Sequence, residues 1–138
     1  MIRYDAAIAD AMMVNVTAQK ELESLEIFEA ERGRVAFRLD VPQEVLNYHG
    51  TIHGGFLATL CEIAAGMAAY SCGVSNVALT SSVNFVKAVG AGPLVVRAKT
   101  SHEGRSTVIA HCRAETPEER LVCEATFTLF VLGPLERA

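Results

Sequence analysis

The feature that most constrains this chain is the run of residues 56–70, the best helix candidate in the sequence. It is rich in Ala, Leu and Met, and only Thr59 and Glu62 interrupt its apolar character. A helix that is apolar on nearly every face is typical of one buried on all sides. At 1.5 Å per residue this helix would be roughly 25 Å long, about the width of a small domain. The run therefore predicts a single central helix that other elements wrap.

Glu62 is the unusual residue in this run, because glutamate is rarely buried without a partner. No cation lies within one helical turn of it in the sequence. One interpretation places Glu62 on a solvent-exposed strip or against an arginine from elsewhere; another makes it a catalytic carboxylate in a partly buried cleft. A membrane span is not expected, because the run contains this carboxylate and lacks flanking clusters of Lys or Arg.

Length and composition predict one globular domain over residues 1–138, with an N-terminal flank at 1–22 and the central helix at 53–71. The chain is 51% apolar, an excess that suggests a surface buried against another copy. The net charge of −4 and the lack of a basic run argue against a nucleic-acid binder. No signal peptide is visible and the four cysteines lack CxxC spacing, so we expect a cytoplasmic protein with reduced thiols.

The other elements follow from hydrophobic periodicity and turn residues. An amphipathic helix that packs as a lid or flank is predicted at 5–20, and one helical turn at 43–47. Strands are predicted at 24–31, 35–41, 77–86, 94–101, 106–114 and 121–132. Turns are predicted at 32–33, 73–76, 90–93 and 103–105, and a loop at 115–120. This order predicts an α+β architecture with an antiparallel sheet curled around the helix.

The motif N-x5-H-G-G-x4-L-x-E runs from Asn47 to Glu62. Together with the order of elements, it resembles the hotdog-fold acyl-CoA thioesterases, specifically the PaaI-like branch of the phenylacetate pathway. The resemblance extends from about residue 25 to residue 132. It implies hydrolysis of an acyl-CoA substrate to a free acid and CoA, with no further cofactor. Much of this branch has Asp where this chain has Glu62, so general base and nucleophile both stay open as its role.

Thioester hydrolysis passes through a tetrahedral oxyanion that needs hydrogen-bond donors. The start of the central helix offers free backbone N–H groups and the positive end of the helix dipole. Gly54 and Gly55 would let a substrate approach that backbone closely, and Gly55 is the preferred oxyanion donor. The alternative is that the two glycines only form a tight turn into the helix.

Glu62 lies about 10–11 Å beyond Gly55 along the same helix, too far to act on a carbonyl held at that helix start. An antiparallel helix from a second subunit would bring its own Glu62 across. The resemblance implies the same arrangement, with sites at the dimer interface. We therefore expect an obligate homodimer with two active sites, assembled further into a homotetramer.

Three further residues are candidates for the catalytic machinery. Asn47 either polarises the carbonyl or holds its loop through an Asx turn. His53 matches the family histidine that supports the oxyanion loop, and a structural role at the helix entry is the alternative. The family often has a hydroxyl residue on the following strand, so the resemblance implies that Thr80 holds the attacking water, with Ser81 and Ser82 as competitors.

Substrate contacts are expected from aromatic and basic residues. Candidate pocket walls are Tyr48, Phe56, Leu57, Leu60 and Phe85. The phosphates of CoA favour a locally basic mouth. The resemblance implies that the Gly104–Arg105 turn lies near the nucleotide or pantetheine, so Arg105 and Lys87 are the expected contacts. The alternative is that these are ordinary outward charges on strands. A metal site at His49, His53 and Glu62 is not expected, because the glycines lie between the histidines and the helix.

Two other functions stay open on this fold. A dehydratase or hydratase of acyl thioesters usually has a proline-containing loop before the helix, where this chain has His53, Gly54 and Gly55. A non-catalytic acyl-CoA-binding module does not need the carboxylate of Glu62. The sequence leaves the acyl group and the pathway open.

Overall fold

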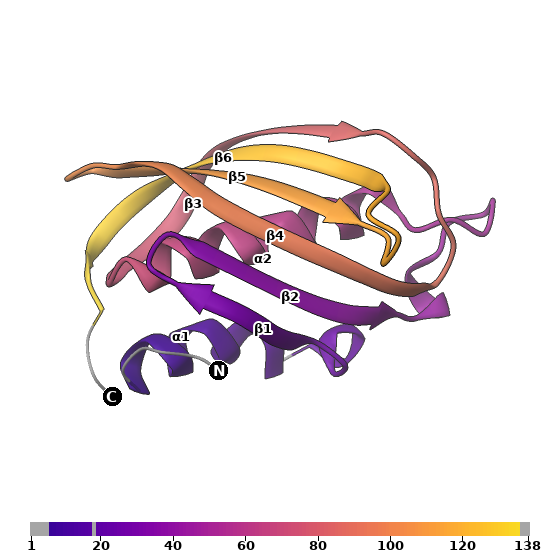
Figure 1. Cartoon of the computed structure of the whole chain (residues 1–138), viewed down its shortest axis with the longest axis horizontal. Coiled ribbons are helices and arrows are strands. Elements are labelled where there is room, and N and C mark those ends of the chain that lie inside the picture. The colour runs from indigo at the N-terminus through magenta and orange to yellow at the C-terminus, as the bar shows by residue number, and fades with distance from the viewer. Residues whose placement is uncertain (1–5, 18, 136–138) are drawn as a thin grey trace.

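The computed structural model describes residues 6–17 and 19–135, and consists of one curved sheet around one long helix (Figure 1). The helices are α1 (Ala6–Thr17) and α2 (Gly54–Ser71), with short 3-10 helices η1 (Lys20–Leu22) and η2 (Gln43–Val45). The strands are β1 (Glu26–Glu31), β2 (Arg34–Val41), β3 (Val74–Phe85), β4 (Gly92–Glu103), β5 (Thr107–Glu115) and β6 (Leu121–Pro134). The α+β prediction is confirmed.

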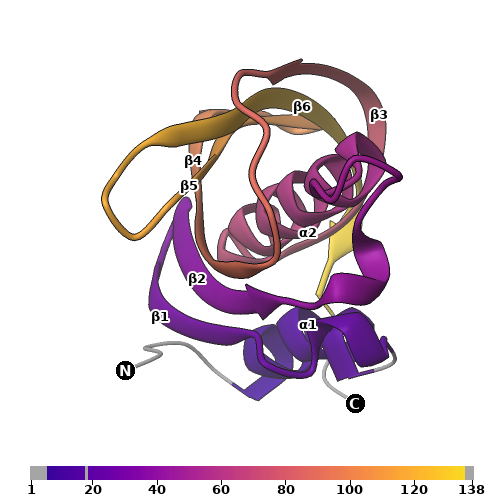
Figure 2. The same cartoon turned by 90° about the vertical axis from the view of Figure 1, so that its right-hand side faces the viewer.

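The six strands form one antiparallel sheet in the order β1-β2-β4-β5-β6-β3. The sheet curves around α2, and α1 lies below the β1–β2 hairpin (Figure 2). Strand β3 leaves the end of α2 and pairs with β6, so it forms one edge of the sheet, and β1 forms the other. The loop at 86–91 connects β3 to β4 and passes over the start of α2 (Figure 2).

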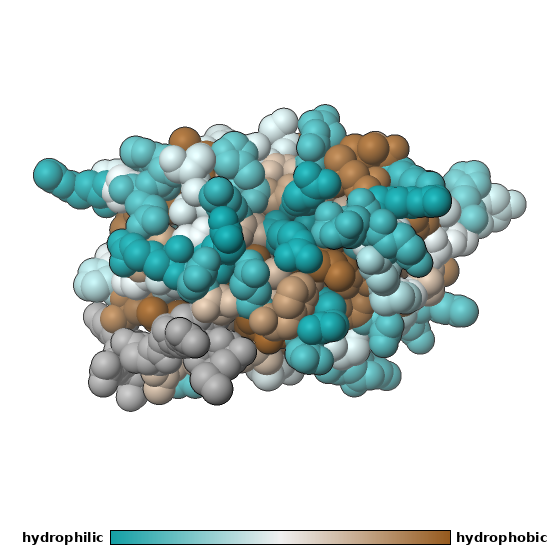
Figure 3. Space-filling view, in the orientation of Figure 1, coloured by the Kyte–Doolittle hydropathy of each residue, from teal (hydrophilic) through white to brown (hydrophobic). Residues whose placement is uncertain are grey.

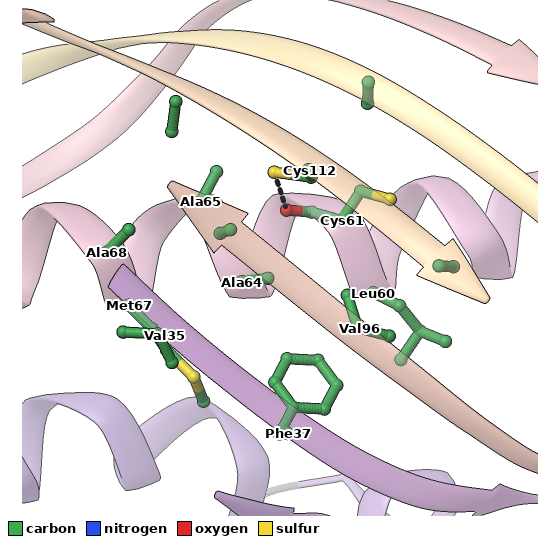
Figure 4. Packing of buried hydrophobic residues seen from close by; sticks show 14 of the residues in the cluster. Val35, Phe37, Leu60, Cys61, Ala64, Ala65, Met67, Ala68, Val96 and Cys112 are labelled. Carbon is green, nitrogen blue, oxygen red and sulfur yellow. Dashed lines mark hydrogen bonds between the residues drawn. The ribbon is translucent and has the colours of Figure 1, made fainter. Parts of the chain in front are cut away.

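The core lies between the concave face of the sheet and one side of α2 (Figure 4). Leu60, Ala64 and Met67 of α2 are fully or almost fully buried against Phe37 of β2 and Val96 of β4. Alanines on this side of α2 let the helix approach the sheet closely, because their side chains are short. Burying the large side chains of this core removes enough apolar surface from water to favour this single arrangement.

Helix α2 is not buried on all sides, which corrects the prediction drawn from its composition. The strip through Gly55, Thr59, Glu62, Gly66 and Tyr70 is partly or fully exposed, at the spacing of one helical face. The curved sheet covers one side of the helix, and α1 covers part of the remainder with the buried side chains of Met12 and Val16. A strip of α2 therefore stays open in the single chain.

Two predicted turns are wrong in their positions. The turn predicted at 73–76 ends earlier than expected. Gly73 has the left-handed backbone (φ 84°) that a turn uses, and β3 begins at the next residue, Val74. Gly92 and Pro93, predicted within a turn, are the first residues of β4, opposite Val41 and Asp40 of β2. Proline is tolerated at the start of a strand, where it removes no central ladder bond. The connection between β3 and β4 is the loop at 86–91.

Candidate active site

The start of α2 leaves two backbone donors open. His53 occupies the N-cap position, and its carbonyl accepts hydrogen bonds from the N–H groups of Phe56 (3.0 Å) and Leu57 (3.1 Å). No backbone hydrogen bond in the described part of the chain uses the N–H of Gly54 or Gly55. These donors lie at the positive end of the helix dipole, where a developing oxyanion is stabilised.

His53 is exposed, and its side chain makes no cap hydrogen bond. Its backbone N–H donates to the carbonyl of Val45 at 3.1 Å, which holds the entry to α2 against η2. The structure therefore gives His53 a backbone role at the helix entry and leaves its imidazole exposed.

Asn47 organises the loop that precedes α2. Its Oδ1 accepts hydrogen bonds from the backbone N–H of His49 (2.9 Å) and of Thr51 (3.2 Å). Its Nδ2 donates to the hydroxyl of Thr51 at 2.9 Å. These contacts form the Asx turn that was one of the two roles expected for Asn47. The side chain holds the loop at 47–51 in place beside the open end of α2.

Glu62 is exposed on the open strip of α2, two turns beyond Gly55. It makes no hydrogen bond or ion pair with residues 6–17 or 19–135. It borders a groove of about 390 Å³ between α1, α2 and β3. The other lining residues are mostly apolar: Met12, Ile63, Gly66, Met67, Tyr70, Asn76, Val77, Ala78 and Leu129. The arrangement places an unpaired carboxylate at the edge of an apolar groove.

The groove differs from the expected pocket walls. None of Tyr48, Phe56, Leu57, Leu60 and Phe85 is among its lining residues. Leu57 and Leu60 point into the core, and Tyr48 is almost fully exposed. The sequence missed Gly66, Tyr70 and Asn76, which come together only because β3 runs back along α2. The four-residue spacing of Glu62, Gly66 and Tyr70 was the available signal for this face.

The register of β3 and β6 separates the three hydroxyl candidates. Ser81 lies opposite Phe127, which is buried on the concave side, so Ser81 is on the face toward α2. Thr80 lies opposite Thr128, on the outer face. An irregularity between Ala78 and Thr80 shifts the alternation by one residue at Leu79. Ser81, and not Thr80, therefore lies on the face toward α2.

The expected basic contacts lie at opposite ends of α2 (Figure 1). Lys87 follows Phe85, whose ring lies against Gly54, so it is near the start of α2. Arg105 lies in the β4–β5 turn near the end of α2, where the backbone N–H of Gly33 donates to Ser71 Oγ (2.8 Å) and Arg32 pairs with Glu103 (2.9 Å). About 24 Å of helix separates the two ends, so Arg105 lies far from Gly55 of the same chain.

Gly104 forms part of the hydrogen bonding that closes the β4–β5 turn. Its N–H donates to the carbonyl of Thr107 at 2.8 Å and closes the β4–β5 turn. A Cβ at this position would lie 2.5 Å from Nε2 of the exposed His102, whose side chain can move, and 3.1 Å from the backbone carbonyl oxygen of Thr107. A larger residue would therefore require a small shift within the turn.

The four cysteines are free and buried. A hydrogen bond to Cys123 and burial raise the pKa of the Cys61 thiol, whose sulfur lies 4.0 Å from that of Cys123. Burial raises the pKa of Cys112 to about 12. Thiols with such raised pKa values remain protonated and are poor nucleophiles, so Cys61 and Cys112 are not candidate nucleophiles.

Across the described ranges 6–17 and 19–135, no group of three or more His, Cys, Asp or Glu side chains is placed to hold a metal ion. No described helix has the length and apolar character needed to cross a membrane.

Comparisons with known proteins agree with the motif. The profile of the thioesterase superfamily matches residues 49–123. The putative esterase ComA2 of Bacillus subtilis is 30% identical over 81% of this chain and 92% of its own length. The acyl-coenzyme A thioesterase PaaI of Escherichia coli is 28% identical over 83% of this chain and 81% of its own length.

Solved structures show the same architecture. The structure of the E. coli PaaI protein matches with a TM-score of 0.84 and 26% identity, covering 92% of each chain. A hypothetical thioesterase from Streptococcus pneumoniae, solved with coenzyme A, matches with a TM-score of 0.80 and 37% identity, covering 83% of this chain and 90% of that one. The hotdog fold and the resemblance to PaaI-like thioesterases are confirmed.

Proposed function

The chain belongs to the thioesterase superfamily, and from that premise we propose that it hydrolyses acyl-CoA thioesters to a free acid and CoA. The observation that carries the proposal is the juxtaposition on one open strip of α2. Two free backbone donors begin the helix at Gly54 and Gly55, and the unpaired carboxylate of Glu62 follows beside an apolar groove. Acyl transfer to water needs an oxyanion site, a base or nucleophile, and a place for an apolar acyl group.

Two subunits complete each site in this proposal. Glu62 is about 10–11 Å from Gly55 along α2, beyond the distance at which it could act on a carbonyl bound there. The open strip of α2 and the exposed edge strand β3 are available for a partner. Val77, Leu79 and Phe85 expose apolar surface on β3, and a long apolar edge strand favours pairing with another chain. A partner with its α2 antiparallel would place its Glu62 near Gly55.

The chemistry then follows from the groups present. The N–H of Gly55, with that of Gly54 beside it, donates to the thioester oxygen as it becomes an oxyanion. Glu62 of the partner subunit either removes a proton from the attacking water or attacks the carbonyl carbon itself. Collapse of the tetrahedral intermediate releases CoA as the thiol. Asn47 keeps the helix entry in place, and Ser81 is positioned to orient water.

The groove beside Glu62 would hold the acyl group. Its apolar lining favours an aliphatic or aryl chain, and the absence of a side chain at Gly66 leaves room in its floor. Met12 of α1 forms one wall, consistent with the N-terminal helix acting as a flank over the site. The flexible methionine would let the wall adapt to different acyl groups.

Release of CoA from a panel of short, long and aryl acyl-CoAs tests the function. Glu62→Gln keeps the size of the side chain and removes its charge, so the rate should fall by at least about a hundredfold. Glu44→Gln, an equal change at an exposed position of η2, should retain wild-type turnover. Wild-type protein that binds the esters without hydrolysing them would instead be an acyl-CoA-binding module. Addition of water to an enoyl-CoA would show a hydratase.

Subunit complementation tests the shared site. Gly55→Ala and Glu62→Gln should each be inactive alone. Random mixing after co-expression should restore about a quarter of wild-type activity, because half of the dimers are hybrids and each hybrid holds one intact site. No restoration would show that both residues act within one chain. Light scattering would show whether the dimer or the expected tetramer forms.

A further inference from the structure

The outer face of the sheet, away from α2, has a polar depression of about 560 Å³, larger than the groove beside Glu62. Teal hydrophilic residues run across the middle of this face (Figure 3). Four of its lining residues are cationic, and they are Arg34, Arg97, Lys99 and Arg113. Its two acidic lining residues are Glu29 and Glu124. Glu115, which binds two of these cations, adds a third carboxylate, so the four cations exceed the acids around the depression by one.

Arg97 and Arg113 form a pair held by one buried carboxylate. They lie directly opposite each other on β4 and β5. Their Nε atoms bind the two oxygens of Glu115, at 3.0 Å for Arg97 and 3.4 Å for Arg113, and the Glu115 side chain is only 8% exposed. The Phe28 ring lies 5.6 Å from the Arg97 guanidinium carbon. Contact through Nε leaves the terminal Nη groups without an acceptor in the described part of the chain.

Lys99 and His111 form a neighbouring row. They lie opposite each other on the same two strands, two residues from the arginine pair. Lys99 is exposed and makes no ion pair with any described residue. His111 is held in one orientation, with Nε2 2.9 Å from Ser101 Oγ and Nδ1 3.1 Å from Thr126 Oγ1. The two rows are about 7 Å apart along the strands.

We propose that this depression binds an anion with two phosphate groups, such as a diphosphate or a bisphosphorylated nucleotide. Preoriented arginine Nη groups match the oxygens of a phosphate in bidentate geometry. Lys99 supplies a point charge for a second phosphate one row away. Glu115 binds both arginines and Glu124 lies directly opposite Arg113 on β6, so the positive charge left for the ligand is mainly that of Lys99, which pairs with no described acid. The sheet separates this site from the open strip of α2, and the site does not depend on the proposed hydrolysis.

Calorimetric titration with inorganic diphosphate tests the site. Lys99→Gln and Arg113→Gln should each weaken binding by at least about tenfold, because each removes a charged hydrogen-bond donor. Arg120→Gln, an equal charge change in the β5–β6 loop, should stay within about twofold of wild type. Lys99→Gln breaks no ion pair, so it keeps the test valid should Arg113→Gln fold poorly.

The remaining outcomes separate the sources of the phosphates. Tighter binding of CoA than of dephospho-CoA, lost in Lys99→Gln together with a raised KM for acyl-CoA, would show that the site holds the nucleotide of the substrate. Binding of diphosphate with an unchanged KM in Lys99→Gln would show a separate phosphorylated ligand. Lack of diphosphate binding by wild type, or equal losses in Arg120→Gln and Lys99→Gln, would overturn the proposal.

Discussion

The ring of Phe85 in β3 lies against Gly54, the first residue of α2: a Cβ added to Gly54 would be 3.1 Å from Cζ of Phe85. Gly55 differs, because no atom of the described residues outside its own helix backbone and chain neighbours lies within 4 Å of a Cβ added there. Contact with β3 therefore accounts for the glycine at 54. No contact among residues 6–17 and 19–135 accounts for the glycine at 55, as our proposal that a substrate approaches this backbone would require.

Gly55→Ala should separate stability from activity. The free energy of unfolding should stay the same or rise by up to about 1 kcal/mol, since alanine favours helix over glycine. The rate should fall about a hundredfold, because a displacement of roughly 1 Å at the reacting carbonyl has that effect. Urea unfolding and CoA release measure the two quantities. Gly54→Ala should gain less stability, because the Phe85 ring must shift, and full activity of Gly55→Ala would contradict the assignment.

Leu79→Lys should weaken the proposed dimer without unfolding the chain. Leu79 is 55% exposed on the free edge of β3, and a charge at such an edge opposes pairing with another strand. The variant should sediment as a monomer and lose activity, since each site would need two subunits. Val14→Lys makes the same change at an exposed position of α1 and should remain dimeric. An active, dimeric Leu79→Lys protein would place the interface elsewhere.

Burial of the Cys112 thiol should make the free energy of unfolding fall as the pH becomes alkaline. Burial raises the pKa of this thiol from 9.0 to about 12, and the neighbouring Cys123 adds to the effect. Between those values the folded chain keeps a proton that the unfolded chain releases, so rising pH favours unfolding. Wild type should lose up to about 1.4 kcal/mol more per pH unit than Cys112→Ala. Urea titrations from pH 8 to above the unfolded pKa measure this difference, and parallel slopes would show that Cys112 does not contribute.

The motif from Asn47 to Glu62 was sufficient to predict the family, because its spacing is local. It predicted the donors at Gly54 and Gly55 and the acid two turns later, and the structure places these groups on one helical strip. It could not predict that Arg105 lies at the far end of α2 from Gly55, or that Ser81 and not Thr80 faces the helix. Both facts depend on strand pairings between residues far apart in the sequence.

Local periodicity by itself determined the elements of this protein. A run favouring helix and strands alternating with a period of two gave an α+β chain with one long central helix. Only the tertiary structure decided which surfaces those elements leave open. Pairing of β3 with β6 makes β3 an edge strand. One extra residue at Leu79 shifts the alternation of β3, so that residues after it face the opposite side of the sheet from the one that the pattern before it predicts. The curve of the sheet leaves the Glu62 strip of α2 uncovered. Register and curvature arise from contacts among all six strands, so no single stretch of sequence encodes them.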